Sequence, residues 1–396
     1  MSRKTLLVLA ASQYQLDTIK TARHLGYRVI TTDNVPTNPG HVLADRSYGI
    51  DTTDAEAVLG LARREKIDGV ISPGTDVAIC TAAHVADRMG LAGPPLEAAA
   101  IVSSKLRFRE FATQRGLPAP EAWPASHDAP ADERHFSRGP LIVKPDRSSG
   151  SKGIFIVRSA EELRQRLPET LSFSQNGCAI LERYIDGFQG TCEGVLQDGR
   201  VALAVVLDRQ TAKPPYVATW GHHLPSLLPT AVQEKLLARI KEVWAMLRVR
   251  DGAFDCDFVA SDGEVFILEM SPRLGGNSIS RLLATGCDFN IVEYCVRHAC
   301  GEAVVLPPHI EAKPSAVVLL GVEQEGRLTY DRGEADALCR ESWVQALTFD
   351  VEPGATVHPF INGRHRVGEA IVSGGDRSEV DAHVSELRQR LKLKAA

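Results

Sequence analysis

The sequence predicts a mixed fold, in which an N-terminal doubly wound parallel α/β domain precedes α+β domains. Residues 1–95 alternate strand-like and helix-like patterns, which is typical of a parallel sheet covered by helices. From residue 140 to residue 208, several strand-like runs follow one another before a helical pattern begins near residue 231, which is typical of an α+β domain. A length of 396 residues is also too great for one small core and indicates two or three domains.

Three runs in the N-terminal region predict buried strands: TLLVLA (5–10), RVITTD (28–33) and GVISPG (69–74). Thr53-x-x-Glu56 resembles a capping box and predicts the start of the helix before the third strand. This βαβαβ order predicts a parallel sheet. Its first turn, AASQYQ, lacks the GxGxxG pattern, so we do not interpret Asp33 after the second strand as a ribose ligand of a dinucleotide.

The rest of the chain begins at a Pro-containing boundary near LAGPP and a loose Pro- and Ala-rich connection at 117–132. Strands are then predicted at 140–146, 153–157, 179–185, 191–197, 201–208, 254–260, 264–269 and 315–322. Helices are predicted around 231–248 and toward Leu391. We therefore predict four units, at 1–95, 96–190, 191–312 and 313–396.

Composition and charge exclude several classes of protein. A net charge of −5 and a pI near 6.2 do not indicate the positively charged surface that binds nucleic acid. No apolar run approaches the roughly 18 residues that span a bilayer, and the N-terminus lacks the apolar core of a signal peptide. The eight cysteines are scattered without a CxxC pair, which favours reduced thiols in the cytoplasm.

The stretch LEMSPRLGGN places Glu269 at the end of an apolar strand, where a buried carboxylate is costly without a cation. The runs FDCDFVA and EVFILE around SDG predict a hairpin. If its loop is residues 262–264, Asp257 lies directly opposite Glu269, with Cβ atoms about 5 Å apart. Such a pair indicates a divalent cation, and ligation by oxygen alone favours Mg²⁺. A solvated hairpin whose acids face water is the alternative.

The stretch IVKPDRSSGSKGIFIV joins two predicted strands by a loop of small residues. Small residues let backbone N–H groups approach anionic oxygens, and Lys144 and Lys152 add positive charge, so the loop is a candidate phosphate cradle. It is no Walker loop, because it does not match GxxxxGK[ST] and a strand follows it. A flexible hairpin tip is the alternative.

Two further segments have features of a nucleotide site. The strand AILER runs into Glu182-Arg183-Tyr184-Ile185, where backbone groups and a carboxylate can hydrogen-bond adenine. A surface strand end with a salt-bridged glutamate is the alternative. Lys105 lies in the first turn of a predicted helix, where a cation is unfavourable unless an anion binds there.

In their order along the chain, these segments resemble the ATP-grasp superfamily, preceded by a domain like its pre-ATP-grasp domain. The resemblance covers essentially the whole chain. It implies two α+β subdomains that clamp ATP, and a carboxylate that is activated as an acylphosphate before a nucleophile attacks it. The cofactors that it implies are ATP and Mg²⁺, with Mn²⁺ as a substitute.

The resemblance implies a role for each matching residue. The residues that match its ATP site are Lys105, Lys144, Ser149, Gly150, Ser151, Lys152, Gly153, Glu182, Arg183, Tyr184, Ile185 and Gln189. Asp257 and Glu269 match its metal ligands, and Arg273 matches the residue that steadies the acylphosphate, with Lys144 as a second catalytic residue. Ser271 stands where many members have an asparagine, and Gln189 where many have an acidic ribose ligand. Whether Ser271 or Asp255 joins the metal site stays open.

Within the superfamily, EMSPRLGGN and the following SISRLLATG resemble the dipeptide and amino-acid ligases of specialised metabolism. The residues that this resemblance places near the substrates are Glu193, His222, His223, Arg273, Gly275, Gly276 and Asn277. Each histidine could instead be a loop imidazole in water, and Glu193 a structural strand residue.

We therefore expect an ATP-dependent carboxylate–amine ligase that forms an amide through an acylphosphate and releases ADP and phosphate. Its substrates would be a small carboxylate and a small amine, with amino acids favoured. An ATP-grasp carboxylase or a formate-dependent formyltransferase of the purine-biosynthetic kind is the alternative enzyme. A non-catalytic nucleotide-binding protein is a third hypothesis, which the complete set of lysines, acids and arginine disfavours. A homodimer stays open.

Overall fold

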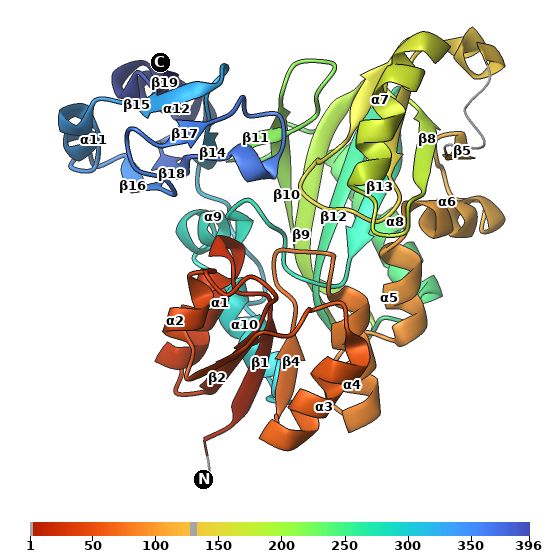
Figure 1. Ribbon diagram of the computed structural model, residues 1–396, viewed down its shortest axis with the longest axis vertical. Coiled ribbons are helices and arrows are strands. Elements are labelled where there is room, and N and C mark those ends of the chain that lie inside the picture. Colours follow the sequence, from red (N-terminus) through yellow and green to blue (C-terminus); the bar gives the residue numbers. More distant parts are fainter. Residues whose placement is uncertain (1–2, 127–132) are drawn as a thin grey trace.

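The computed structural model describes residues 3–126 and 133–396. Its N-terminal unit, red and orange in Figure 1, is a parallel sheet with the strand order β3-β2-β1-β4. The strands are β1 (Thr5–Leu9), β2 (Arg28–Thr32), β3 (Arg46–Tyr48) and β4 (Gly69–Ile71). The helices are α1 (Leu16–His24), α2 (Gly40–Leu43), α3 (Ala55–Glu65) and α4 (Ile79–Met89).

This sheet confirms the predicted α/β start, since the three apolar runs form β1, β2 and β4. β3 carries no sequence signal because its residues are exposed or half-buried and form no apolar run. The predicted capping box is wrong: the N-cap of α3 is Asp54, whose side chain accepts a hydrogen bond from the amide of Ala57. The hydroxyl of Thr53 instead donates to Asp51.

A small antiparallel sheet follows, with the order β5-β8-β6-β7. Its strands are β5 (Ala122–Ala125), β6 (Leu141–Pro145), β7 (Phe155–Val157) and β8 (Ala179–Arg183), and the helices of this region are α5 (Leu96–Val102), α6 (Lys105–Gln114) and α7 (Ala160–Ser172). β5 lies within the stretch predicted as a loose connection, because pairing with β8 outweighs its local composition. The last part of that predicted connection, 127–132, lies outside the described residues.

The largest sheet is antiparallel and has the order β13-β12-β9-β10-β11-β14-β18-β16. Its strands are β9 (Phe188–Gln197), β10 (Arg200–Thr211), β11 (Thr219–Leu224), β12 (Gly252–Ser261), β13 (Glu264–Ser271), β14 (Ser315–Leu320), β16 (Val344–Phe349) and β18 (Gly368–Ser373). A boundary at 190/191 would cut through β9. A boundary at 312/313 would fall before β14, which pairs with β11, so the sheet runs without interruption into the C-terminal part.

Helices cover both faces of this large sheet. α8 (Thr230–Met246) packs on one face together with α5 and α6. α9 (Ile279–Gly286) and α10 (Ile291–Ala299) pack on the other face. α10 also contacts the N-terminal sheet through Val296 and Ala299, so this helix layer fixes the N-terminal unit against the large sheet (Figure 1).

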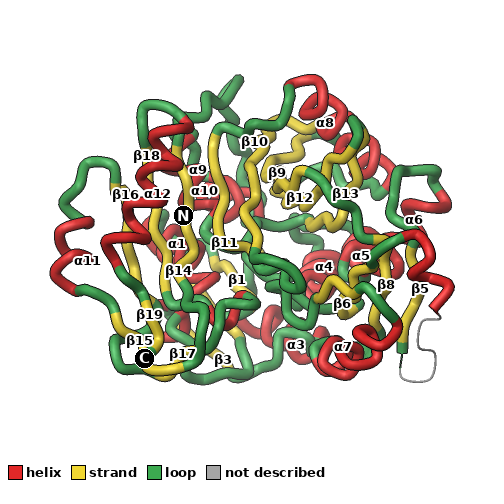
Figure 2. Tube along the Cα trace, turned by 90° about the horizontal axis from the view of Figure 1, so that it is seen from above, coloured by secondary structure: helices red, strands yellow, loops and turns green. Residues whose placement is uncertain are grey.

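The C-terminal part adds a three-stranded sheet and two helices. Its elements are β15 (Gly326–Thr329), β17 (Thr356–Val357), β19 (Lys394–Ala395), α11 (Arg332–Leu338) and α12 (Arg377–Leu391). Seen from above in Figure 2, they lie on the opposite side of the molecule from the small β5–β8 sheet. Within residues 3–126 and 133–396, we find no helix whose length and apolar character would suit a bilayer span. All eight cysteines are free thiols.

Candidate active site

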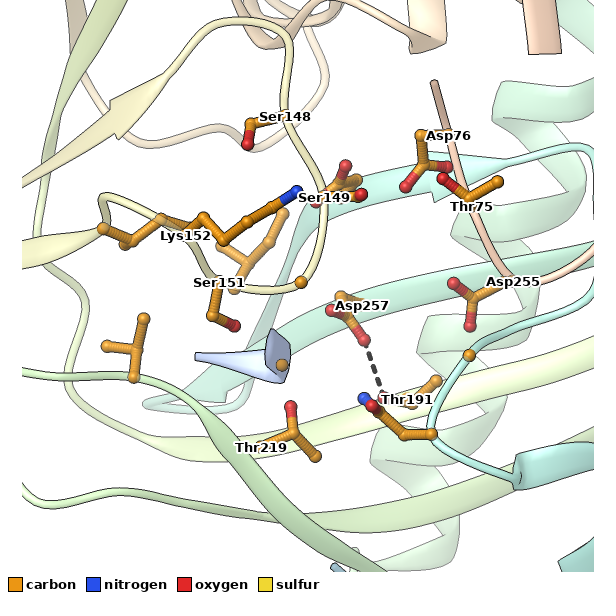
Figure 3. Close-up of a pocket in the computed structure, with 18 of the residues that line it drawn as sticks. Thr75, Asp76, Ser148, Ser149, Ser151, Lys152, Thr191, Thr219, Asp255 and Asp257 are labelled. Atoms are coloured by element: carbon orange, nitrogen blue, oxygen red, sulfur yellow. Dashed lines mark hydrogen bonds between the residues drawn. The ribbon is translucent and has the colours of Figure 1, made fainter. Parts of the chain in front are cut away.

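A cavity of about 670 Å³ lies where the N-terminal sheet, the small sheet, the large sheet and the C-terminal part meet. Figure 3 shows the loop with Ser149 and Lys152 on one side, Asp255 and Asp257 of β12 on another, and Asp76 of the N-terminal unit nearby. The sequence-predicted residues on the lining are Lys105, Lys144, Ser149, Gly150, Ser151, Lys152, Glu182, Arg183, Tyr184, Ile185, Gln189, His222, Asp257, Glu269, Arg273, Gly276 and Asn277.

The two predicted metal carboxylates lie directly opposite each other, although the predicted hairpin loop is wrong. The loop is the two-residue turn Asp262-Gly263, with φ of 51° and 75°, and not residues 262–264. A bulge at Leu268 then shifts the register by one residue and pairs Asp257 with Glu269. An extra residue in one strand re-aims the side chains beyond it, here toward the cavity.

Arg109 of α6 holds this bulge, and the sequence analysis missed it. Its Nη1 and Nη2 donate to the carbonyls of Ile267 and Leu268 at 2.8 and 2.5 Å, and its Nε donates to Glu182. The side chain is buried. The available signal was its position four residues after Lys105, because residues i and i+4 lie on the same face of a helix.

Each metal carboxylate already has a cation beside it. Lys105 Nζ lies 3.3 Å from Glu269 Oε1, and Arg209 Nη1 lies 2.8 Å from Asp257 Oδ2. Thr191 donates to the other oxygen of Asp257 at 2.6 Å, the contact dashed in Figure 3. The side chains of Asp257 and Glu269 are partly exposed, at 27% and 30%, and each is compensated by its neighbouring cation.

Glu182, expected at the adenine, is committed to two cations. Lys144 Nζ and Arg109 Nε each lie 2.5 Å from one of its oxygens, and the side chain is 1% exposed. Burial raises the pKa of Glu182, but the charges of Arg109 and Lys144 outweigh burial and lower that pKa to about 2. Burial also lowers the pKa of Lys144, despite Glu182. The strand end that follows, Arg183 to Ile185, lines the cavity.

The candidate phosphate loop touches two other parts of the chain. Lys105 Nζ donates to the carbonyl of Ser148 at 3.3 Å, and the amide of Gly363 donates to the carbonyl of Gly150 at 2.9 Å. Lys152 faces Arg364 of the C-terminal part, and burial followed by that charge lowers the Lys152 pKa.

Gly153 does not line the cavity, contrary to its expected role in the loop. It has a φ of 66°, and a Cβ there would lie 2.9 Å from Phe173. A glycine is therefore needed at this position for backbone conformation and packing.

Arg273 is held more tightly than its expected role in binding an acylphosphate requires. Its Nε and Nη2 donate to Asp76, and its Nη1 donates to Asp255 and to the carbonyl of Leu274. Of the five N–H groups of an arginine, one remains without an acceptor among the described residues. Burial raises the pKa of Asp76, but Arg273 outweighs burial and lowers it.

The two residues left open for the metal site differ in their surroundings. The hydroxyl of Ser271 donates to Asp76 at 2.8 Å and is therefore engaged away from the metal carboxylates. Asp255 lines the cavity two residues before Asp257, and burial raises its pKa to about 7 although Arg273 opposes this rise.

Glu193 and Gly275, both expected near the substrates, contact each other and do not line the cavity. Both oxygens of Glu193 accept from the amide of Gly275, at 2.9 and 3.1 Å, and Glu193 is fully buried. A Cβ at Gly275 would lie 2.5 Å from the carboxylate, so the turn has room for glycine alone. Burial and the neighbouring Asp255 raise the pKa of Glu193. Its role is to hold the turn that precedes Gly276 and Asn277.

The two histidines of β11 point to opposite faces of the large sheet, because side chains alternate along a strand. His222 lines the cavity, and neither ring nitrogen has a hydrogen-bond partner among the described residues. His223 lies 3.3 Å from Asp381 of α12, on the far face and without hydrogen-bond geometry. The substrate contact expected for His223 is therefore wrong.

We expect acid to destabilise the protein through these histidines. Burial, and then Arg209 for His222 and Arg377 for His223, lowers their pKa values to about 3 and about 4. An unfolded histidine has a pKa of about 6.5. Between these values the unfolded chain binds protons that the folded chain does not. The free energy of unfolding therefore decreases as the pH is lowered. At pH 5 each histidine lowers it by about 2 kcal/mol relative to pH 7.

Chemical denaturation at pH 7 and pH 5 checks this expectation. In His223→Gln, the change in unfolding free energy between the two pH values should be smaller than in the wild type by about 2 kcal/mol. His24→Gln, at an exposed position on α1, is the control and should keep the wild-type pH dependence. A His223→Gln profile parallel to the wild type would show that His223 is protonated in the folded protein.

The candidate phosphate loop, two buried lysines and two opposed carboxylates surround one cavity, an arrangement suited to binding a nucleotide. Residues 137–281 match the ATP-grasp domain, and residues 319–396 match the L-amino acid ligase C-terminal domain 2. The chain therefore contains an ATP-grasp domain, a domain of ATP-dependent ligases.

Individual relatives resemble the chain over its whole length. Formate-dependent phosphoribosylglycinamide formyltransferase of Synechococcus sp. (strain RCC307) is 26% identical over 402 residues, which cover 98% of this chain and 97% of the relative. The crystal structure of L-amino acid ligase from Bacillus licheniformis has a TM-score of 0.84 at 18% identity, covering 100% and 99% of the two chains. Phosphoribosylglycinamide synthetase from Anaerococcus prevotii has a TM-score of 0.78 at 20% identity, covering 100% of both chains. These structures confirm the predicted fold.

Proposed function

We propose that the protein is an ATP-dependent ligase that joins a carboxylate and an amine, both amino acids or closely related small molecules, through an amide bond. The observation that carries this proposal is the single cavity lined by the phosphate loop, Lys105, Lys144 and the opposed carboxylates Asp257 and Glu269. A phosphate cradle facing a pair of carboxylates is suited to the transfer of the γ-phosphoryl group of ATP.

Asp257 and Glu269 fit a Mg²⁺ ion that binds together with ATP. Both line the cavity and are paired across β12 and β13. In the described part of the chain, no cluster of three or more His, Cys, Asp or Glu side chains could hold a metal. Two carboxylates, completed by phosphate oxygens and water, are the kind of ligand set that Mg²⁺ takes at nucleotide sites. When bound, the ion would neutralise negative charge on the phosphates.

The reaction we propose has two steps. A carboxylate oxygen of the first substrate bonds to the γ-phosphorus, and the bond to the bridging oxygen breaks with release of ADP. The amine nitrogen of the second substrate then bonds to the carbonyl carbon and loses a proton, and phosphate leaves with the electron pair. Lys105 and Lys144 hold phosphate oxygens, and loop 149–152 covers them and excludes water. The strand end 183–185 and Gln189 hold the adenosine.

Two observations favour amino acids as substrates. The C-terminal segment that matches the L-amino acid ligase domain supplies Gly363 and Arg364 to the cavity lining. His222 also lies on the lining, and its imidazole, which burial keeps neutral, has no hydrogen-bond partner among the described residues at either nitrogen. Formyl transfer to an amine is the second candidate function, which the whole-length similarity to a formate-dependent formyltransferase supports.

Measuring ADP release across pairs of amino acids tests the proposal. We expect at least one pair to release ADP and phosphate and to yield a product whose mass is that of both substrates less one water. Formate with phosphoribosylglycinamide, and bicarbonate with an amine, are run in parallel. Turnover only in the reaction that contains formate and phosphoribosylglycinamide would favour formyl transfer, the second candidate function. Release of AMP and pyrophosphate would rule out the acylphosphate.

A further inference from the structure

Two arginines on the cavity lining, Arg209 and Arg273, differ in how many of their N–H groups are hydrogen-bonded. Arg273 uses four of the five that an arginine carries, through Asp76, Asp255 and the carbonyl of Leu274. Arg209 makes two hydrogen bonds, from Nε to Thr219 and from Nη1 to Asp257, each at 2.8 Å. Three N–H groups of Arg209 thus have no acceptor among the described residues.

Arg209 lies on the lining of the cavity. Its side chain is 11% exposed and lies on the cavity lining, as do its two partners Thr219 and Asp257, which Figure 3 places in the same part of the cavity. His222, its neighbour across β10 and β11, lies on the same face of the sheet. Since Asp257 is a proposed Mg²⁺ ligand, a guanidinium that shares its carboxylate lies next to the proposed position of the transferred phosphoryl group.

We propose that Arg209 is a catalytic residue that binds the transferred phosphoryl group. This inference rests on the proposed ligase function. When the γ-phosphorus bonds to the substrate carboxylate and the bond to ADP breaks, negative charge is carried by the three remaining phosphoryl oxygens. A planar guanidinium can donate to two of them at once. Thr219 and Asp257 fix Arg209 beforehand, so little reorganisation is needed.

The test compares Arg209→Gln and Arg209→Lys with a matched control, Arg377→Gln. Arg377 forms an equally close pair with Asp208, the residue before Arg209, on the opposite face of the same strand. At saturating Mg²⁺, Arg209→Gln should lower kcat about 100- to 1000-fold and change KM for ATP by less than about threefold. The kcat of Arg209→Lys should lie between those of the wild type and Arg209→Gln, because lysine keeps the positive charge but lacks a planar guanidinium that donates to two oxygens. Arg377→Gln should keep the wild-type kcat.

A binding measurement tests Arg209 without knowledge of the substrates. The affinity for Mg²⁺–ADP with aluminium fluoride, which imitates the transferred phosphoryl group, should fall at least about 100-fold in Arg209→Gln. The affinity for Mg²⁺–ADP alone should stay within about threefold of the wild type. An unchanged affinity for the fluoride complex would overturn the assignment, as would a wild-type kcat of Arg209→Gln at saturating Mg²⁺.

The failures of the two proposals are distinguishable. If the wild-type protein releases no ADP with any tested carboxylate and amine, the proposed function fails, and the fluoride complex still decides the role of Arg209. If the wild type turns over and Arg209→Gln keeps its kcat, the ligase function stands and the role of Arg209 is wrong.

Discussion

Exchange of Glu269 for glutamine is expected to abolish ATP turnover, by about 1000-fold or more, while the protein stays folded. Glutamine keeps the shape of the side chain and removes the charge that a Mg²⁺–ATP complex would need. The Glu269 side chain is 30% exposed, and its partner Lys105 keeps the carbonyl of Ser148 as a hydrogen-bond acceptor, so the protein should stay folded. ADP release measured over a Mg²⁺ titration, with the melting temperature of the same sample, checks both parts.

Glu264→Gln is the matched control for this experiment. Glu264 lies on the same strand at the hairpin end and pairs with Lys235 at 3.0 Å on the surface, away from the cavity. This variant should turn over ATP like the wild type. Wild-type turnover of Glu269→Gln at saturating Mg²⁺ would show that Glu269 is no metal ligand.

Arg273→Met is expected to lower both the stability and the turnover of the protein. Arg273 lies between Asp76 of the N-terminal unit and Asp255 of β12, at 2.6 and 2.9 Å, and is itself 10% exposed. Removing the cation leaves two largely buried carboxylates without a counter-charge, which lowers the free energy of unfolding by up to about 3 kcal/mol. The deficit should shrink as the pH falls, because protonation removes the buried charges. Denaturation curves at several pH values, together with ADP release, measure these effects.

A thermodynamic cycle with Asp76→Asn separates the pair from other effects of Arg273. The double variant should regain part of the stability that Arg273→Met loses, because one of the unpaired carboxylates is gone. Strictly additive losses in the cycle would mean that Asp76 and Arg273 do not stabilise each other. In the structure, Arg273 links Asp76 of the N-terminal unit to Asp255 of β12 and keeps one N–H group without an acceptor among the described residues.

The metal hairpin illustrates how far local sequence leads. Its two strands and the tight turn follow from apolar runs around Asp262-Gly263, and the sequence also predicted that Asp257 would face Glu269. The reason was wrong, since a two-residue turn alone would have paired Asp257 with the residue before Glu269. The bulge at Leu268 corrects the register, and Arg109 holds it from 159 positions away in the chain. No local pattern encodes such a contact.

What the sequence determined by itself is the order of the elements and the chemistry of their ends: a parallel α/β start, a small-residue loop after Lys144, and carboxylates at the hairpin. These follow from periodicity and from residue types, which are local properties. The tertiary structure alone decided which side chains meet. His222 lines the cavity, whereas His223 lies on the opposite face of the sheet. Glu193 accepts a hydrogen bond from the amide of Gly275. Asp76 and Arg209 lie on the cavity lining and pair with site residues. The physical reason is that a strand residue points to one face or the other according to its register with strands distant in sequence, and a shift of one residue reverses it.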